Sequence, residues 1–157
     1  MHHNAHRLLV ALTLLSTSGI ACADLHWAWD YSAQGIRASG TLTTTETPDK
    51  DGYYLITGIK GTRNGKLISA LQAAGTAIPG NAGYPVDNLI LEAKPHLSVH
   101  GLGYATADGN FANPFFADFH TPPAYLEFYA MHPLDATQAA KSSELPVRFN
   151  ARRIPRN

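Results

Sequence analysis

The chain has 157 residues, 45% of them hydrophobic and only 15% charged, and twelve Lys and Arg balance twelve Asp and Glu. This length is typical of one domain, and the balanced charge excludes the basic field of a nucleic-acid-binding protein. With 13 Gly and 10 Pro, the composition predicts a turn-rich folded domain rather than a disordered chain, and no nucleic-acid partner.

The first residues have the three parts of a secretory signal peptide. A weakly basic start ending in Arg7 precedes an apolar run at 8–20, and Ala21-Cys22-Ala23 supplies small residues for cleavage before Asp24. The apolar run is shorter than the ~20 residues that span a bilayer, and no second run follows it. We therefore expect cleavage after Ala23.

Cleavage at this point would divide the chain into a signal peptide at 1–23 and a single β domain at 24–157. We expect no transmembrane anchor in the mature chain. The mature protein is then expected in the periplasm or secreted. The alternative is a lipoprotein acylated at Cys22. Cleavage after Ala23 removes the only Cys, so we expect neither a disulfide nor a thiolate metal site.

Short β-rich runs separated by turn residues follow Asp24. The first run places Trp27, Trp29 and Tyr31 on one face, and Gly40 inside the second predicts a bulge or a bend. We expect strands at 26–31, 36–45, 53–59, 66–71, 86–93, 97–106, 111–119, 124–131 and 147–152. A long loop is expected at 72–85, and a loop or one short helix at 132–144.

Most connections between these runs are too short for the crossovers of a parallel sheet. The sequence therefore predicts an all-β antiparallel meander of about eight or nine strands, closed like a barrel, with a two-sheet sandwich as the alternative. If the first and last strands pair, their polar faces would bring Asp30 close to Arg148.

Metal motifs are weak in this sequence. His96 and His100 lie in an expected strand, where four residues span ~13 Å, too far to share one ion. Asp49 to Gly52 begins like a calcium loop, but position twelve is Lys60 instead of Glu, so a turn is the better interpretation. We expect no metal site and no cofactor.

Catalytic motifs are equally weak. The Gly-x-Ser-x-Gly elbow of hydrolases is absent. Carboxylates that could serve a glycosidase are Asp87, Glu92 and Glu127. We expect no catalytic residues and a protein that is not an enzyme.

Aromatic residues are numerous, and they form either the core or a partly open pocket for a ligand. Phe115 and Phe116 are adjacent, so one of them should face outward from its strand. The candidate ligand-binding residues are Trp27, Trp29, Tyr104, Phe115 and Phe116, for an unknown small-molecule, glycan or protein ligand.

Several segments together resemble the N-terminal parts of PEP-CTERM-sorted proteins, which are small exported bacterial proteins. The segments are the aromatic first strand, ASGTLTT at 38–44, YLITGIKGTRNG at 54–65, VDNLI at 86–90 and GLGY at 101–104. The resemblance implies an exported β-rich fold and no particular reaction. Because the chain ends in FNARRIPRN without the family's sorting tail, it also implies release rather than anchoring.

The leading functional hypothesis is an exported, non-enzymatic binding or envelope-associated module. One alternative is a small extracytoplasmic polysaccharide hydrolase, which would need a deep cleft with two facing carboxylates. Another is a lipocalin-like carrier, which would need a sealed apolar cavity.

Overall fold

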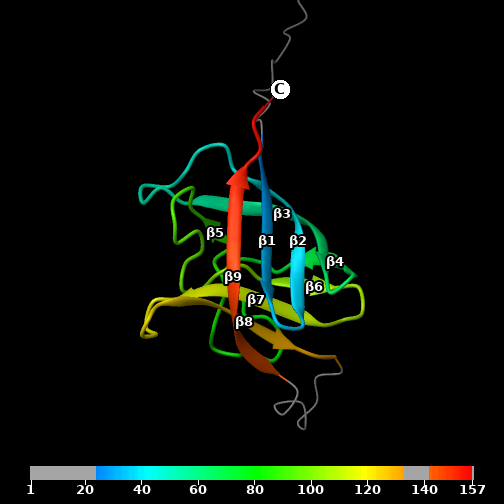
Figure 1. The fold of residues 1–157 in the computed structure, drawn as a ribbon. Coiled ribbons are helices and arrows are strands. Elements are labelled where there is room, and N and C mark those ends of the chain that lie inside the picture. Colours follow the sequence, from blue (N-terminus) through cyan, green and yellow to red (C-terminus); the bar gives the residue numbers. More distant parts are fainter. Residues whose placement is uncertain (1–23, 133–141, 157) are drawn as a thin grey trace, which may run out of the picture.

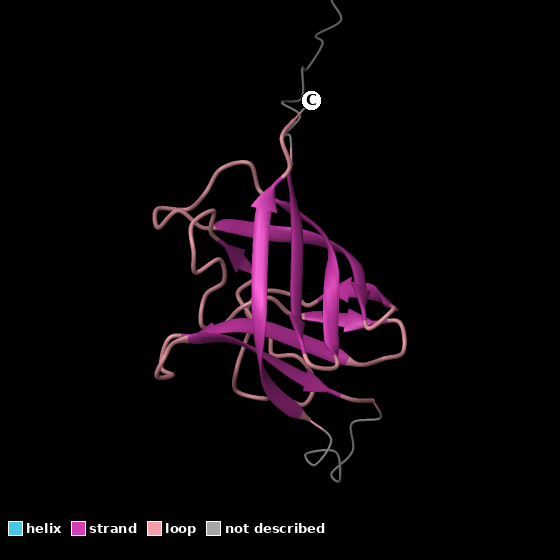
Figure 2. Cartoon of the chain, viewed as in Figure 1, coloured by secondary structure: helices cyan, strands magenta, loops and turns pink. Residues whose placement is uncertain are grey.

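The computed structural model describes residues 24–132 and 142–156 (Figure 1). The expected signal peptide at 1–23, the lipoprotein alternative at Cys22 and most of the segment 132–144 lie outside the described residues. The described chain consists of strands joined by loops and turns (Figure 2).

Nine strands make up the fold. They are β1 (Leu25–Ala33), β2 (Ile36–Thr44), β3 (Tyr54–Arg63), β4 (Lys66–Leu71), β5 (Leu89–Ile90), β6 (Tyr104–Thr106), β7 (Phe111–Ala117), β8 (Ala124–Ala130) and β9 (Ser143–Arg153).

All pairings between these strands are antiparallel, and they close the sheet on itself. The order is β2-β1-β9-β8-β7-β6-β4-β3-β5, and β2 also pairs with β3. Eight strands therefore form a closed barrel, and β5 adds to β3 as a ninth. The expected barrel-like meander is confirmed. In Figure 1, β9 and β1 run side by side and cross the direction of β7 and β8.

Alternating burial places the core inside the barrel. In β1, Trp27, Trp29 and Tyr31 are buried on one face, as the sequence predicts, and they meet Leu42 and Phe149 of neighbouring strands in one cluster. This interior is the main apolar core of the described chain.

Two expected strands are much shorter than predicted. Only Leu89–Ile90 of 86–93 and Tyr104–Thr106 of 97–106 are strands. The reason is Asn88, whose backbone has a φ of 54° and whose side-chain amide bonds the backbone of Gln72 and Gly103. These bonds turn the chain and replace a regular strand ladder. At the other end of the chain, β9 begins at Ser143, earlier than the expected 147.

Of the bulge or bend expected at Gly40, the bulge is absent. The register shift between β2 and β3 lies at Thr43/Thr44, whereas Gly40 faces Gly61 directly, with Trp29 opposite it on β1. A Cβ on Gly40 would lie 1.9 Å from the carbonyl oxygen of Lys60. Glycine is therefore needed here because the two backbones approach too closely for any side chain.

We predict that Gly40→Ala lowers the free energy of unfolding by about 1–3 kcal/mol, since the added methyl forces β2 and β3 apart. The measurement is urea denaturation of the variant beside the wild type. Gly58→Ala is the matched control, because its Cβ would have its nearest neighbour at 3.4 Å, in ordinary contact with Thr43. Equal stability of the two variants would contradict the prediction.

Candidate functional site

Three of the candidate ligand-binding aromatics lie in the barrel interior. Trp27 and Tyr104 are 0% exposed and Trp29 is 2% exposed. Trp29 stacks on Tyr31 and on Phe149, with ring centroids 5.8 Å and 6.5 Å apart. These residues pack the core, and their role as ligand contacts stays a prediction.

The adjacent pair Phe115 and Phe116 does face both sides of β7. Phe116 meets Tyr125 edge-on inside the barrel at 5.1 Å. Phe115 faces the other side, where it is 7% exposed and packs with Ala117 and Leu126 in a second cluster. Phe115, which faces outward, is therefore covered by other residues. The five candidate residues do not line one common pocket.

A buried ion pair that the sequence pattern does not predict crosses the barrel interior. Arg63 of β3 donates from Nε to Oε2 of Glu127 at 2.7 Å and from Nη2 to Oε1 at 2.6 Å. The Arg63 guanidinium also lies 3.6 Å from the ring centroid of Tyr129. The hydroxyl of Tyr31 donates to Glu127, and it is hydrogen-bonded to the hydroxyl of Tyr104. This group of five side chains is called the buried polar cluster below.

The ionisable groups of the buried polar cluster are bonded to one another. Burial, followed by the negative charge of neighbouring groups, raises the pKa of Tyr31 well above its ordinary value. Burial also raises the pKa of Tyr104. Both phenols therefore stay protonated near neutral pH, and both carboxylate oxygens of Glu127 accept hydrogen bonds from Arg63. Such a fully paired arrangement holds strands together and leaves no free base.

We predict that Arg63→Met lowers the free energy of unfolding by about 3–5 kcal/mol, because it leaves the buried Glu127 charge without its cation. The double variant Arg63→Met/Glu127→Leu should be more stable than Arg63→Met alone. Denaturant unfolding of the two single variants and the double variant measures this coupling. Additive losses in the double variant would show that the pair is not coupled.

A second prediction concerns alkaline pH. The unfolded chain loses the Tyr31 proton near pH 10, whereas the folded protein keeps it, so this stabilisation is present below pH 10 and is lost as pH rises further. Tyr31→Phe should therefore lose stability less steeply above pH 10, by up to ~1.4 kcal/mol per pH unit. The measurement is the free energy of unfolding between pH 8 and pH 11. Tyr84→Phe, at a 69% exposed side chain, is the control and should keep the wild-type slope.

The three acids considered for hydrolysis are each engaged elsewhere. Asp87 accepts a hydrogen bond from Ser98 at 2.5 Å, Glu92 pairs with Arg153 at 2.8 Å, and Glu127 belongs to the buried polar cluster. Each of the three acids thus has a hydrogen-bond or ionic partner of its own within the described residues.

The histidines and the acidic turn also have local roles. The Nδ1 of buried His96 lies 3.0 Å from the carbonyl oxygen of Leu91, while His100 is exposed. Asp49 Oδ1 accepts from the backbone N–H of Asp51 and of Tyr53 at 2.9 Å, as expected of a turn. Among the described residues, no three metal-ligating side chains gather.

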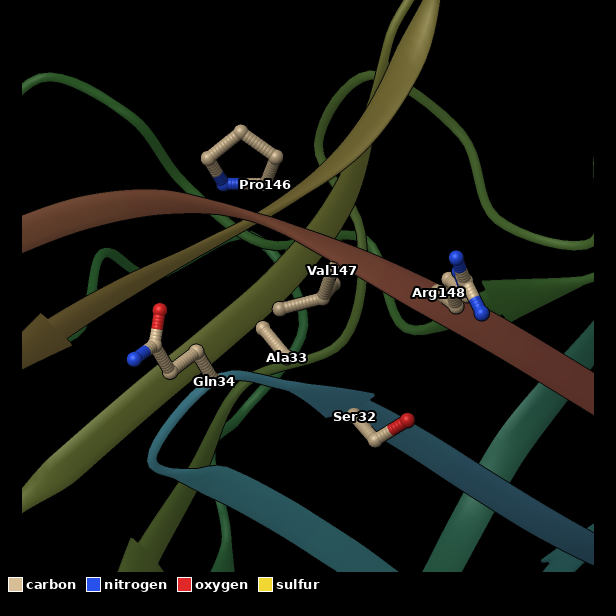
Figure 3. Close-up of a pocket in the computed structure, with 6 residues that line it drawn as sticks. All are labelled: Ser32, Ala33, Gln34, Pro146, Val147 and Arg148. Atoms are coloured by element: carbon tan, nitrogen blue, oxygen red, sulfur yellow. The ribbon is translucent and has the colours of Figure 1, made fainter.

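A surface groove lies beside β9, where this strand changes its pairing partner. This strand pairs with β8 up to Val147 and with β1 from Arg148 onward, and β1 ends at Ala33. A groove of about 420 Å³ lies at this change of partner, with Val147 and Ala33 pointing toward each other across it (Figure 3). Its lining is Ser32, Ala33, Gln34, Pro146, Val147 and Arg148.

A second groove, of about 320 Å³, lies on the other side of the β1–β2 hairpin. It shares Ser32 and Ala33 with the first and adds Arg37 and Asn64. The Asn64 side chain braces this turn, since its Oδ1 accepts from the Arg37 backbone N–H at 2.8 Å. The two grooves therefore flank one hairpin, and each has an arginine in its lining.

A third groove, of about 670 Å³, lies where β1 begins and β9 ends. The backbone N–H of Ile154 donates to the carbonyl of His26 at 2.8 Å and holds these two segments together. The lining is Leu25, His26, Glu92, Arg153, Ile154, Pro155 and Arg156. All three grooves thus border β1 or its hairpin.

The first and last strands pair, as expected. Asp30 lies opposite Asn150, and Arg148 lies opposite Ser32, one outward position further along. No ion pair joins Asp30 to Arg148 in the part of the chain that the structure describes. The polar faces of β1 and β9 therefore lie side by side as expected, but Asp30 and Arg148 do not form an ion pair.

Within residues 24–132 and 142–156, the structure has no helix with the length and apolarity to cross a membrane.

No protein-family model matches the chain, and neither a curated protein nor a solved structure matches it.

Proposed function

We propose that this protein is an exported, non-enzymatic binding module that holds its ligand on the outside of the barrel, around the β1–β2 hairpin and along β9. The observation that carries the proposal is the contrast between a barrel interior filled by side chains and a wall with three grooves around one strand pair.

The filled interior argues against a carrier that encloses its ligand. Trp27, Tyr31 and Tyr104 occupy the space in which a lipocalin-like protein would hold an apolar molecule, and all three are 0% exposed. The buried polar cluster adds an ion pair to this interior. An apolar ligand would have to separate the two charges without giving either of them a new partner. Binding at the outer grooves requires neither change.

Export is supported by the three-part signal at 1–23 and by the resemblance to the N-terminal parts of PEP-CTERM-sorted proteins. The absence of Cys from the chain after Ala23 agrees with a fold held by its core alone. We place the mature protein in the periplasm or outside the cell.

Export and binding are tested separately on protein isolated from the exported fraction of its host. Intact mass spectrometry should give a polypeptide that begins at Asp24. A mass that includes residues 1–23 would contradict cleavage, and a lipid-modified Cys22 would show an anchored lipoprotein.

Hydroxyl-radical footprinting with and without the concentrated exported fraction then locates the ligand. We expect reduced oxidation at Pro146 and at His26, which line two of the grooves, and unchanged oxidation at the exposed loop residues Tyr84 and Phe119. Unchanged oxidation at every groove residue would contradict the proposed function.

A further inference from the structure

Cations gather on one outer face of a chain whose total charge is balanced. The outward positions of β9, β1, β2 and β3 alternate with buried ones, so these side chains lie on one surface of the sheet. We call the part of this surface that lies between Arg152 and Arg148 of β9 the cationic face; its residues are Ala28, Asp30, Ser32, Arg37, Ser39, Thr41, Lys60, Thr62, Arg148, Asn150 and Arg152. The outward positions beyond the Arg152 row, among them His26, Thr43 and Gly58, do not belong to it.

The strand register sets the cations at the corners of this face. Arg152, Ala28, Thr41 and Lys60 form one row across four strands, because each lies opposite the next. At ~4.8 Å per strand, the Cα atoms of Arg152 and Lys60 are ~14 Å apart.

A second cationic row lies four residues away, ~13 Å along the strands. In this row Ser32 lies between Arg148 and Arg37, and the two hairpin grooves are at the same place. Charge is thus spread over an extended surface and is not concentrated at one point.

The four corner cations lack acidic partners. Arg37, Lys60, Arg148 and Arg152 are exposed, and none forms an ion pair with a carboxylate among the described residues. Asp30, in the middle row, is the single acid on the cationic face. Charge complementarity therefore calls for a ligand with several separated negative charges.

The remaining positions are small or hydroxyl-bearing. The middle row runs Asn150, Asp30, Ser39 and Thr62, and the other non-charged positions are Ala28, Ser32 and Thr41. These side chains are short, and all of them except Ala28 can form hydrogen bonds with hydroxyl groups. The cationic face has no aromatic or large aliphatic side chain.

We propose that the cationic face binds an anionic polysaccharide, with Arg37 and Arg148 pairing with its carboxylates and the hydroxyl and amide groups between them bonding the sugar hydroxyls. This inference rests on the proposed function and names its ligand class. The absence of aromatics disfavours single-stranded nucleic acid, which binds by base stacking. A lipid surface or a protein would instead require apolar anchors on this face.

The test is the affinity of the exported protein for polygalacturonate, measured by calorimetry at low and at physiological salt. We expect binding that weakens with salt, and roughly tenfold weaker binding for each arginine removed in Arg37→Gln/Arg148→Gln. The matched control is Lys50→Gln/Lys94→Gln, which removes the same charge from exposed sites off the cationic face and should leave affinity unchanged. Thermal melting of both variants checks that each one folds.

An equal loss of affinity in the control variant would overturn the proposal, because net charge alone would then explain binding. Tighter binding to neutral dextran, to an oligothymidylate or to phosphatidylglycerol vesicles would also overturn it. If polygalacturonate fails to bind while the exported fraction still protects the groove residues, this inference fails and the proposed function stands. If neither binds, both fail.

Discussion

The Arg63–Glu127 ion pair is the interaction on which the interior of this barrel depends. It joins β3 to β8 across the core, Tyr31 of β1 donates a further hydrogen bond to Glu127, and Tyr104 of β6 is hydrogen-bonded to Tyr31. A charge removed from water is tolerated only when its partners are held in place, so the four strands must keep their register for this pair to survive. The aromatic core packs around the group and shields it from solvent.

The same constraint supports the proposal that the ligand binds on the outside of the barrel. An interior that holds a closed ion pair and stacked rings has no room for a ligand unless that core is taken apart. On the wall, in contrast, a groove lies where β9 changes its pairing partner from β8 to β1, and binding there needs no rearrangement of the core. Fold and proposed binding surface therefore follow from one arrangement of strands.

Much of the fold could be predicted from local patterns. Alternation in the first strand gives the inward face of Trp27, Trp29 and Tyr31, and the Asn-Gly pair at 64–65 gives the hairpin between β3 and β4. The prediction was wrong for most of 86–106, because apolar runs there resemble strands while the Asn88 side chain turns the chain.

The sites were less predictable, because they depend on contacts between distant segments. Arg63 and Glu127 are separated by 64 positions, and only their inward places in alternating strands could have marked them. The cationic face likewise depends on register, since Lys60 and Arg152 come to lie in one row only after four strands pair. The C-terminal arginines were visible in the sequence, but their partners in the sheet were not.

The change of partner along β9 also has a consequence for the order of folding. β9 follows the other strands of the barrel in the sequence, so β1 and β8 each keep an open edge until residues 143–153 pair with them. Long-range antiparallel closure of this kind is slow compared with hairpin formation. The barrel therefore cannot close before β9 is in place, and until then β1 and β8 each present an unpaired edge to which another strand could add.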